Sequence, residues 1–154
     1  MSPRSNNYAV SKFISTMKQY KFKIEEWEPN KDFFPPFMFL GGDRGILAYV
    51  QFKVVNNSTQ TYATDLNDML KVVACAESEL DRPVFFVYID ETSDSITFET
   101  NEQIKDRLYY DENSVDSQKQ WYIPEKHDIG DFNNLIRMFS ELKTQSVRFR
   151  NEPL

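Results

Sequence analysis

Two polar residues, Gln51 and Lys53, interrupt the clearest strand-like stretch of the sequence and are its first candidates for chemistry. Residues 46–55 have the composition of a β-strand. Residues i and i+2 of a strand project to the same side of a sheet. The two side chains are therefore expected in one site, where Gln51 offers a carbonyl oxygen and Lys53 a positive charge.

The sequence lacks the residues that other common catalytic or ligand-binding sites require. His127 is the only histidine, so neither a zinc site nor a Ser-His-Asp arrangement is expected. Cys75 falls beside alanines in a helical stretch, which is typical of a small core residue. The pair Gly41 and Gly42 is not followed by a lysine and a helix in the order of a phosphate-binding loop. These two glycines therefore predict a turn.

The segments before this strand are expected to lead into it as a meander. Apolar residues recur at helical spacing over 6–20, and 20–27 alternates like a half-buried strand. A short apolar strand at 37–40 is joined to 46–55 by a glycine-rich turn. The result is a helix followed by three consecutive antiparallel strands.

The segments after the strand return to helical and then to strand periodicity. An apolar stripe predicts a helix over 65–80, capped by Thr64 or Asp65. Residues 84–89 are apolar on both faces, which indicates a central strand. The remaining expected elements are strands at 95–99 and 121–123, a short helix over 102–109, a polar loop over 111–118 and a last helix capped by Asp131.

This order of elements, with Gln51-Phe52-Lys53 on the third strand, resembles the PD-(D/E)XK nuclease-like superfamily. Gln-x-Lys in place of the commoner Glu-x-Lys is similar to the Mrr-like domains. The resemblance implies a single α/β domain with a restriction-endonuclease-like core and a mixed central sheet. That core would span about 6–90 of the 154 residues, with a C-terminal extension over about 91–145 and a tail over 146–154.

The resemblance also implies a Mg²⁺ site, because the family brings an acid near its second strand together with the acid-x-Lys of its third. Here Asp32 and Gln51 would be metal ligands and Lys53 the catalytic lysine. Asp43 is the competing acid, but as a turn residue it would lie roughly 26 Å from Gln51 along the strand. A hairpin centred on Asp43 pairs residues whose numbers sum to 86, so that Lys53 faces Phe33 and Asp32 lies nearby.

The first helix lacks the glutamate that many members of the family supply. No acid occurs between Asn6 and Lys23, and Glu25 or Glu26 on the first strand is left as a substitute. Gln51 brings no charge, so metal binding is expected to be weaker than with a glutamate.

Charge and composition restrict the partners. The net charge of −6 disfavours DNA as a general partner, since nucleic-acid affinity depends on cations that neutralise phosphates. A protein partner is the alternative. The sequence has no apolar run long enough to cross a bilayer and no apolar leader, and its one cysteine suits a reducing compartment. A cytoplasmic protein is expected.

Two functions follow as hypotheses. The first is a Mg²⁺-dependent nuclease, or a nuclease-like domain, from a defence or mobile-element system. The second is a catalytically silent protein of the same fold that acts as a protein–protein interaction module. The acidic balance and the missing helix acid favour the second, whereas Lys53 together with Asp32 favours the first.

Overall fold

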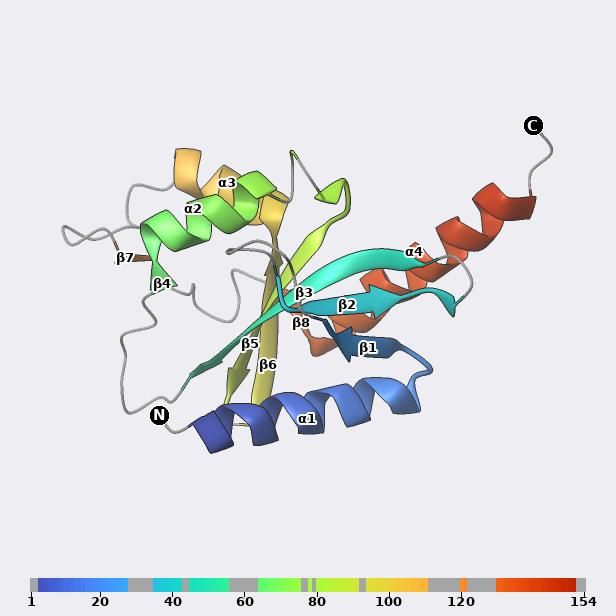
Figure 1. Ribbon diagram of the computed structural model, residues 1–154, viewed down its shortest axis with the longest axis horizontal. Helices are drawn as coiled ribbons and strands as arrows, with labels where there is room; N and C mark the ends of the chain where they lie inside the picture. Colours follow the sequence, from blue (N-terminus) through green and yellow to red (C-terminus); the bar gives the residue numbers. More distant parts are fainter. Residues whose placement is uncertain are drawn as a thin grey trace.

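A six-stranded mixed sheet forms the centre of the computed structural model, with helices on both faces (Figure 1). The structure describes residues 3–27, 35–42, 45–55, 64–75, 78, 80–91, 94–110, 120–121 and 130–151. Along the chain the elements are α1 (Pro3–Gln19), β1 (Lys23–Glu26), β2 (Phe37–Leu40), β3 (Ile46–Val55), β4 (Thr64–Asp65), α2 (Leu66–Cys75), β5 (Val84–Asp90), β6 (Ser95–Thr100), α3 (Asn101–Tyr110), β7 (Gln120–Trp121), β8 (Gly130–Asp131) and α4 (Phe132–Asn151).

The sheet has the order β1-β2-β3-β5-β6-β8. β1, β2 and β3 are consecutive antiparallel strands, and β5 lies parallel to β3. β6 and β8 complete the sheet as antiparallel neighbours, while β4 and β7 form a separate pair. The expected meander and the strand at 84–89 beside 46–55 are confirmed. The chain is therefore one mixed α/β domain.

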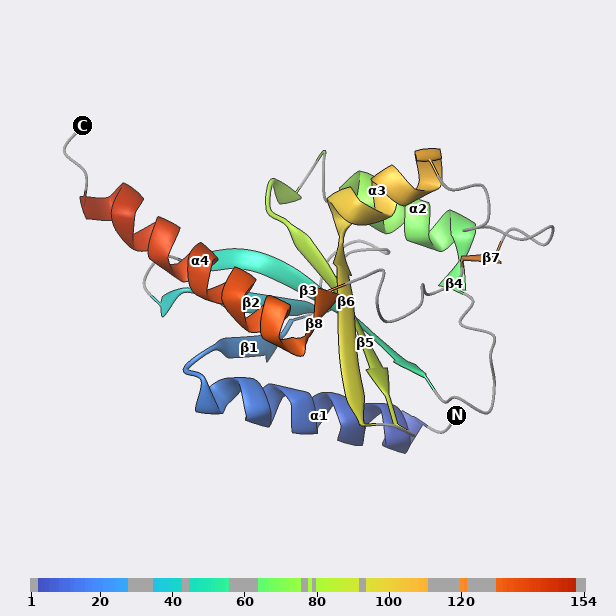
Figure 2. The same cartoon turned by 180° about the vertical axis from the view of Figure 1, so that it is seen from behind.

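One face of the sheet is covered by α1 and α4, and their contacts form the larger core (Figure 2). Aromatic rings dominate it: Phe39 stacks on Phe139 with centroids 4.2 Å apart, and Phe85 meets the edge of Phe139 at 4.9 Å. α4 begins where Asp131 Oδ1 accepts a hydrogen bond from Asn134 N at 2.9 Å, as expected of an N-cap. Both helices thus contribute to one continuous core.

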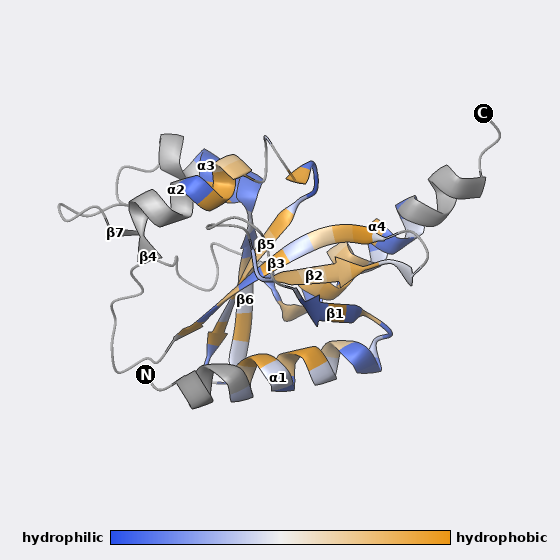
Figure 3. Ribbon diagram, in the orientation of Figure 1, coloured by the Kyte–Doolittle hydropathy of each residue, from blue (hydrophilic) through white to orange (hydrophobic). Residues whose placement is uncertain are grey.

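The opposite face is covered by α2 and α3, which pack on β3 and β5 through a smaller cluster. α3 begins with a capping box, because Thr100 N donates to Gln103 Oε1 and Gln103 N donates back to Thr100 Oγ1. α2 is a regular α-helix over Leu66–Cys75, and the described residues 78 and 80, which lie within the expected span to 80, are π-helical. Figure 3 shows that the central strands are largely apolar, whereas the edge strand β1 is hydrophilic.

The register of the β2–β3 hairpin differs by one from the expected register. Position numbers sum to 87 in three of the four pairs, namely Phe37 with Val50, Met38 with Tyr49, and Phe39 with Ala48. An irregularity between Phe39 and Leu40 absorbs the extra residue. It adjoins a turn in which Gly42 and Gly45 adopt φ angles of 65° and 78°. Glycine adopts these left-handed conformations without strain, whereas other residues rarely do. The register used to bring Asp32 near Lys53 is therefore wrong in the described part of the hairpin.

Among the described residues, no helix is both long enough and apolar enough to span a bilayer. The expected turn residue Asp43, the loop over 111–118 and His127 lie outside the described residues, as do positions 122–123 of the strand expected at 121–123.

Candidate functional site

β3 carries Gln51 and Lys53 on the face of the sheet that α2 and α3 cover. Val50 and Val54 belong to the core beneath α1 and α4, and Tyr49 belongs to the cluster beneath α2 and α3. Because side chains alternate along a strand, Gln51 and Lys53 lie on the side of Tyr49. Both are half-buried, so they sit between the core and solvent.

Gln51 presents a buried acceptor to this face. Its Oε1 atom is buried and has no hydrogen-bond partner among the residues that the structure describes. Leaving such an atom unpaired costs about 1–3 kcal/mol, and buried polar atoms in native proteins nearly always have a partner. The Gln51 Oε1 atom is therefore a covered acceptor without a donor in the described part of the chain.

Lys53 supplies the positive charge. No described residue forms an ion pair with it. In the parallel pairing, Lys53 lies beside Tyr88 and Gln51 lies beside Phe86 of β5. Without a fixed carboxylate partner in the described part of the chain, the ammonium can serve an anionic ligand.

A buried glutamate extends the polar character of this face onto β6. Phe98 packs into the opposite core, so Glu99 faces the α2–α3 side. Glu99 is 1% exposed, and the Tyr88 hydroxyl donates to its Oε2 atom at 2.6 Å. Sequence reasoning missed this pair. The available signal was an acid within a strand whose other residues fit the core.

Tyr49 precedes Gln51 by two residues on the same face of β3. Burial raises the pKa of its phenol, an effect that the nearby Arg82 charge partly opposes. The phenol therefore stays protonated, and Tyr49 serves as packing for Trp27, whose ring centroid is 5.7 Å away.

The pairing of β1 with β2 shows which face of the sheet Glu25 and Glu26 each occupy, and so which of them could substitute for the missing helix acid. Glu25 pairs with Met38, which contacts the α2–α3 cluster, so it shares the face of Gln51. Glu26 pairs with Phe37, which packs against the other core. Glu25 forms an exposed ion pair with Lys23 at 3.1 Å and lies on the edge strand, two strands away from β3.

Only part of a magnesium site can be judged from the described residues. Asp32 lies outside them. Within them, no three His, Cys, Asp or Glu side chains gather closely enough to hold a metal ion. Gln51 fits a neutral oxygen ligand, and the charge that Mg²⁺ requires would come from Asp32.

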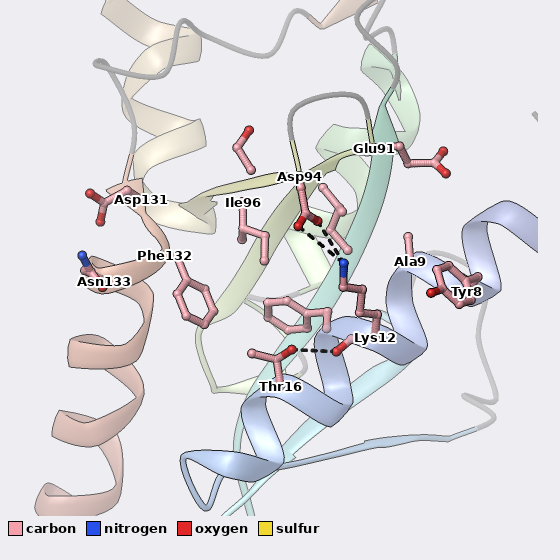
Figure 4. Close-up of a pocket in the computed structure, with 13 residues that line it drawn as sticks. Tyr8, Ala9, Lys12, Thr16, Glu91, Asp94, Ile96, Asp131, Phe132 and Asn133 are labelled. Atoms are coloured by element: carbon pink, nitrogen blue, oxygen red, sulfur yellow. Dashed lines mark hydrogen bonds and ion pairs between the residues drawn. The ribbon is translucent and has the colours of Figure 1, made fainter.

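A separate hollow of about 510 Å³ lies on the opposite face, between α1, the β5–β6 turn and the start of α4. Figure 4 shows Lys12 of α1 directed at Asp94, with which it forms an ion pair at 3.3 Å, while Asp131 and Phe132 line the other wall. Its floor is apolar, and its rim contains more carboxylates than cations. Neither Gln51 nor Lys53 lines it, so this hollow and the candidate site are different places.

Comparison with known proteins supports the fold. No family model matches the chain, and no curated protein matches its sequence. A solved structure, D212, described as a nuclease from a fusselovirus, superposes with a TM-score of 0.59. The two are 16% identical, and the match covers 91% of this chain and 92% of D212. The chain therefore has a nuclease-like α/β fold.

Proposed function

We propose that this chain is a divalent-metal-dependent nuclease of the PD-(D/E)XK type, in the Gln-x-Lys form similar to Mrr-like domains. Asp32 and Gln51 would be the metal ligands, and Lys53 the catalytic lysine. The observation that carries the proposal is the buried, unpaired Gln51 Oε1 in the described part of the chain, with Lys53 two residues along the same face. The nuclease-like fold shared with D212 supports it.

The roles follow from the chemistry of each side chain. Gln51 contributes a neutral carbonyl oxygen, and Asp32 contributes the negative charge that attracts a hard cation. The Lys53 ammonium orients the attacking water or stabilises the negative charge that develops on the phosphate, as the water oxygen bonds to phosphorus and the bond from phosphorus to the leaving oxygen breaks. The chemistry that a bound Mg²⁺ supplies is polarisation of the phosphate and activation of a water.

The setting is part of the same proposal. A core over about 6–90 would carry the site, with 91–145 as an extension and 146–154 as a tail. D212 is described as a nuclease from a fusselovirus, which supports a defence or mobile-element context. The cytoplasmic location in this proposal rests on the single cysteine of the sequence.

Cleavage of DNA with Mg²⁺ or Mn²⁺ tests the proposal, at low ionic strength because the net charge of −6 weakens binding. Lys53→Ala should abolish cleavage without loss of fold, whereas Lys105→Ala on α3 should leave it unchanged. Gln51→Glu should lower the Mg²⁺ concentration needed, because it adds charge at the same position. Cleavage that survives Lys53→Ala would mark a contaminating nuclease and contradict the proposal.

A catalytically silent interaction protein is the second candidate. It is favoured by the acidic net charge and by the lack of a three-member metal cluster in the described residues. Absence of both cleavage and Mn²⁺ binding, the latter followed by calorimetry with Gln51→Ala as the control, would select it.

A further inference from the structure

Three lysines surround the end of α1 and the start of β1. Lys18 lies in the last turn of the helix, Lys21 follows it and Lys23 opens the strand; all three are exposed. Together they line a hollow of about 340 Å³. The hollow also has apolar lining from Ile14, Phe22 and Ile24. It therefore combines an apolar floor with a cationic rim.

The rim keeps most of its positive charge. Among the described residues, Glu25 is the one acid that lines the hollow, and it forms an ion pair with Lys23 at 3.1 Å. Lys18 and Lys21 form no ion pair with any residue in the described ranges. In a protein of net charge −6, this is a local reversal of sign.

The backbone at Lys21 has a conformation that glycine most often adopts. Lys21 has a φ of 65° and closes α1 with a Schellman motif, in which Lys21 N donates to Lys18 O and Phe22 N donates to Met17 O. Glycine is preferred at this position because a Cβ atom is strained there. Attraction to the carboxyl end of the helix does not explain the lysine, since Lys18 already supplies it. Strained positions concentrate at functional sites.

α4 holds this turn in place. Lys143 Nζ donates to Lys21 O at 3.0 Å and lies 5.5 Å from the centroid of the Phe22 ring. The contact joins two distant segments and adds a fourth cation beside the hollow. The backbone of the turn at Lys21 is therefore held in place before any ligand binds, which lowers the conformational entropy lost on binding.

We propose that this hollow binds a single strand of nucleic acid, with Lys18, Lys21 and Lys23 on phosphates and an unpaired base on the apolar floor. A duplex keeps its bases stacked and offers mainly phosphates, whereas a single strand offers both groups. The inference rests on the proposed nuclease function, because it assigns the surface that holds the substrate strand away from Gln51 and Lys53.

Fluorescence anisotropy with labelled oligothymidine, in EDTA to prevent cleavage, tests the surface. A triple glutamine variant of the rim should bind at least about tenfold more weakly, and the slope of log affinity against log salt should fall by about 2, as expected for three lost phosphate contacts. The matched control carries the same charge change at three other exposed lysines and should bind like the wild type. The test set is Lys18→Gln, Lys21→Gln and Lys23→Gln, and the control set is Lys12→Gln, Lys71→Gln and Lys105→Gln.

Lys21→Gly separates binding from folding. It removes one cation but relieves the backbone, so Tm should rise by roughly 2 °C while binding weakens. Equal loss of binding in the two triple variants would overturn the proposal. The proposal would also be overturned if the triple rim variant bound oligothymidine like the wild type but self-associated. The lysines would then serve to protect the edge strand β1 from pairing with another chain.

The outcomes separate this surface from the nuclease proposal. Oligothymidine binding that depends on the rim lysines, without cleavage in Mg²⁺, would retain the surface and reject the nuclease. Cleavage that is unaffected by the rim variants would retain the nuclease and reject the surface. No binding by the wild type, or tighter binding of a duplex than of its separate strand, would reject the surface.

Discussion

The two faces of the sheet differ in how polar their buried residues are. Beneath α1 and α4 the described residues form an apolar core that contains six buried phenylalanines: Phe13, Phe22, Phe39, Phe85, Phe98 and Phe139. Beneath α2 and α3 the same strands turn polar groups inward, including Gln51, Tyr88 and Glu99. Polar burial costs stability unless each group is paired. The face beneath α1 and α4 therefore stabilises the fold. The face beneath α2 and α3 loses stability by burying polar groups, as expected where those groups serve a function.

The largest effect should come from breaking the apolar face. Phe139 is fully buried and contacts Phe22, Phe39 and Phe85. Phe139→Ala should reduce the free energy of unfolding by about 3–5 kcal/mol through lost contacts and a cavity. Urea denaturation followed by tyrosine and tryptophan fluorescence measures this. A loss below about 1 kcal/mol would contradict the stabilising role of this face.

A smaller loss is expected on the polar face. Tyr88→Phe removes the hydroxyl that donates to buried Glu99 at 2.6 Å. Removing the donor to a buried acceptor costs about 1–3 kcal/mol, so the unfolding free energy should fall by about that amount. Glu99→Gln, alone and in the Tyr88→Phe background, tests whether the two side chains are coupled. Additive effects of the two substitutions would show that the pair is not coupled.

The smallest effect should have the opposite sign. Gln51→Leu replaces an unpaired buried oxygen with an apolar side chain of similar size, so stability should rise by about 1 kcal/mol. The same change should abolish Mn²⁺ binding if Gln51 is a ligand. Thermal denaturation and calorimetry together measure both effects. Lower stability would indicate that Gln51 has a structural partner, and the contrast between the faces would then be less sharp.

Local patterns predicted the elements well and their pairing less well. The glycine-rich turn before it and the polar residues after it placed both ends of β3 at Ile46 and Val55, as the structure has them. The predicted hairpin register was wrong because Gly42 and Gly45 adopt left-handed conformations beside an irregular pair. Glycine adopts many backbone conformations, so its presence in the sequence does not predict the geometry of the turn. Pro3 begins α1 earlier than expected, which agrees with the preference for proline in the first turn.

The candidate site shows the same division. The shared face of Gln51 and Lys53 follows from the strand period alone. The acid within a strand-like stretch was visible at Glu99, but its burial depends on β5 pairing with β6 and on α3 packing against both strands. The role of Asp32 remains a prediction, since it lies outside the described residues.

The parallel pairing of β3 with β5 has a consequence for how the chain folds. Its seven residue pairs begin with Tyr49 and Val84, which are far apart in sequence, whereas β1, β2 and β3 pair with near neighbours. Closing the longer loop costs more entropy, so the meander should form first and wait for β5. Until residue 84 has left the ribosome, β3 has an open edge with Val50 and Val54 on one side. A nascent chain of this protein is therefore most exposed to aggregation at that stage of synthesis.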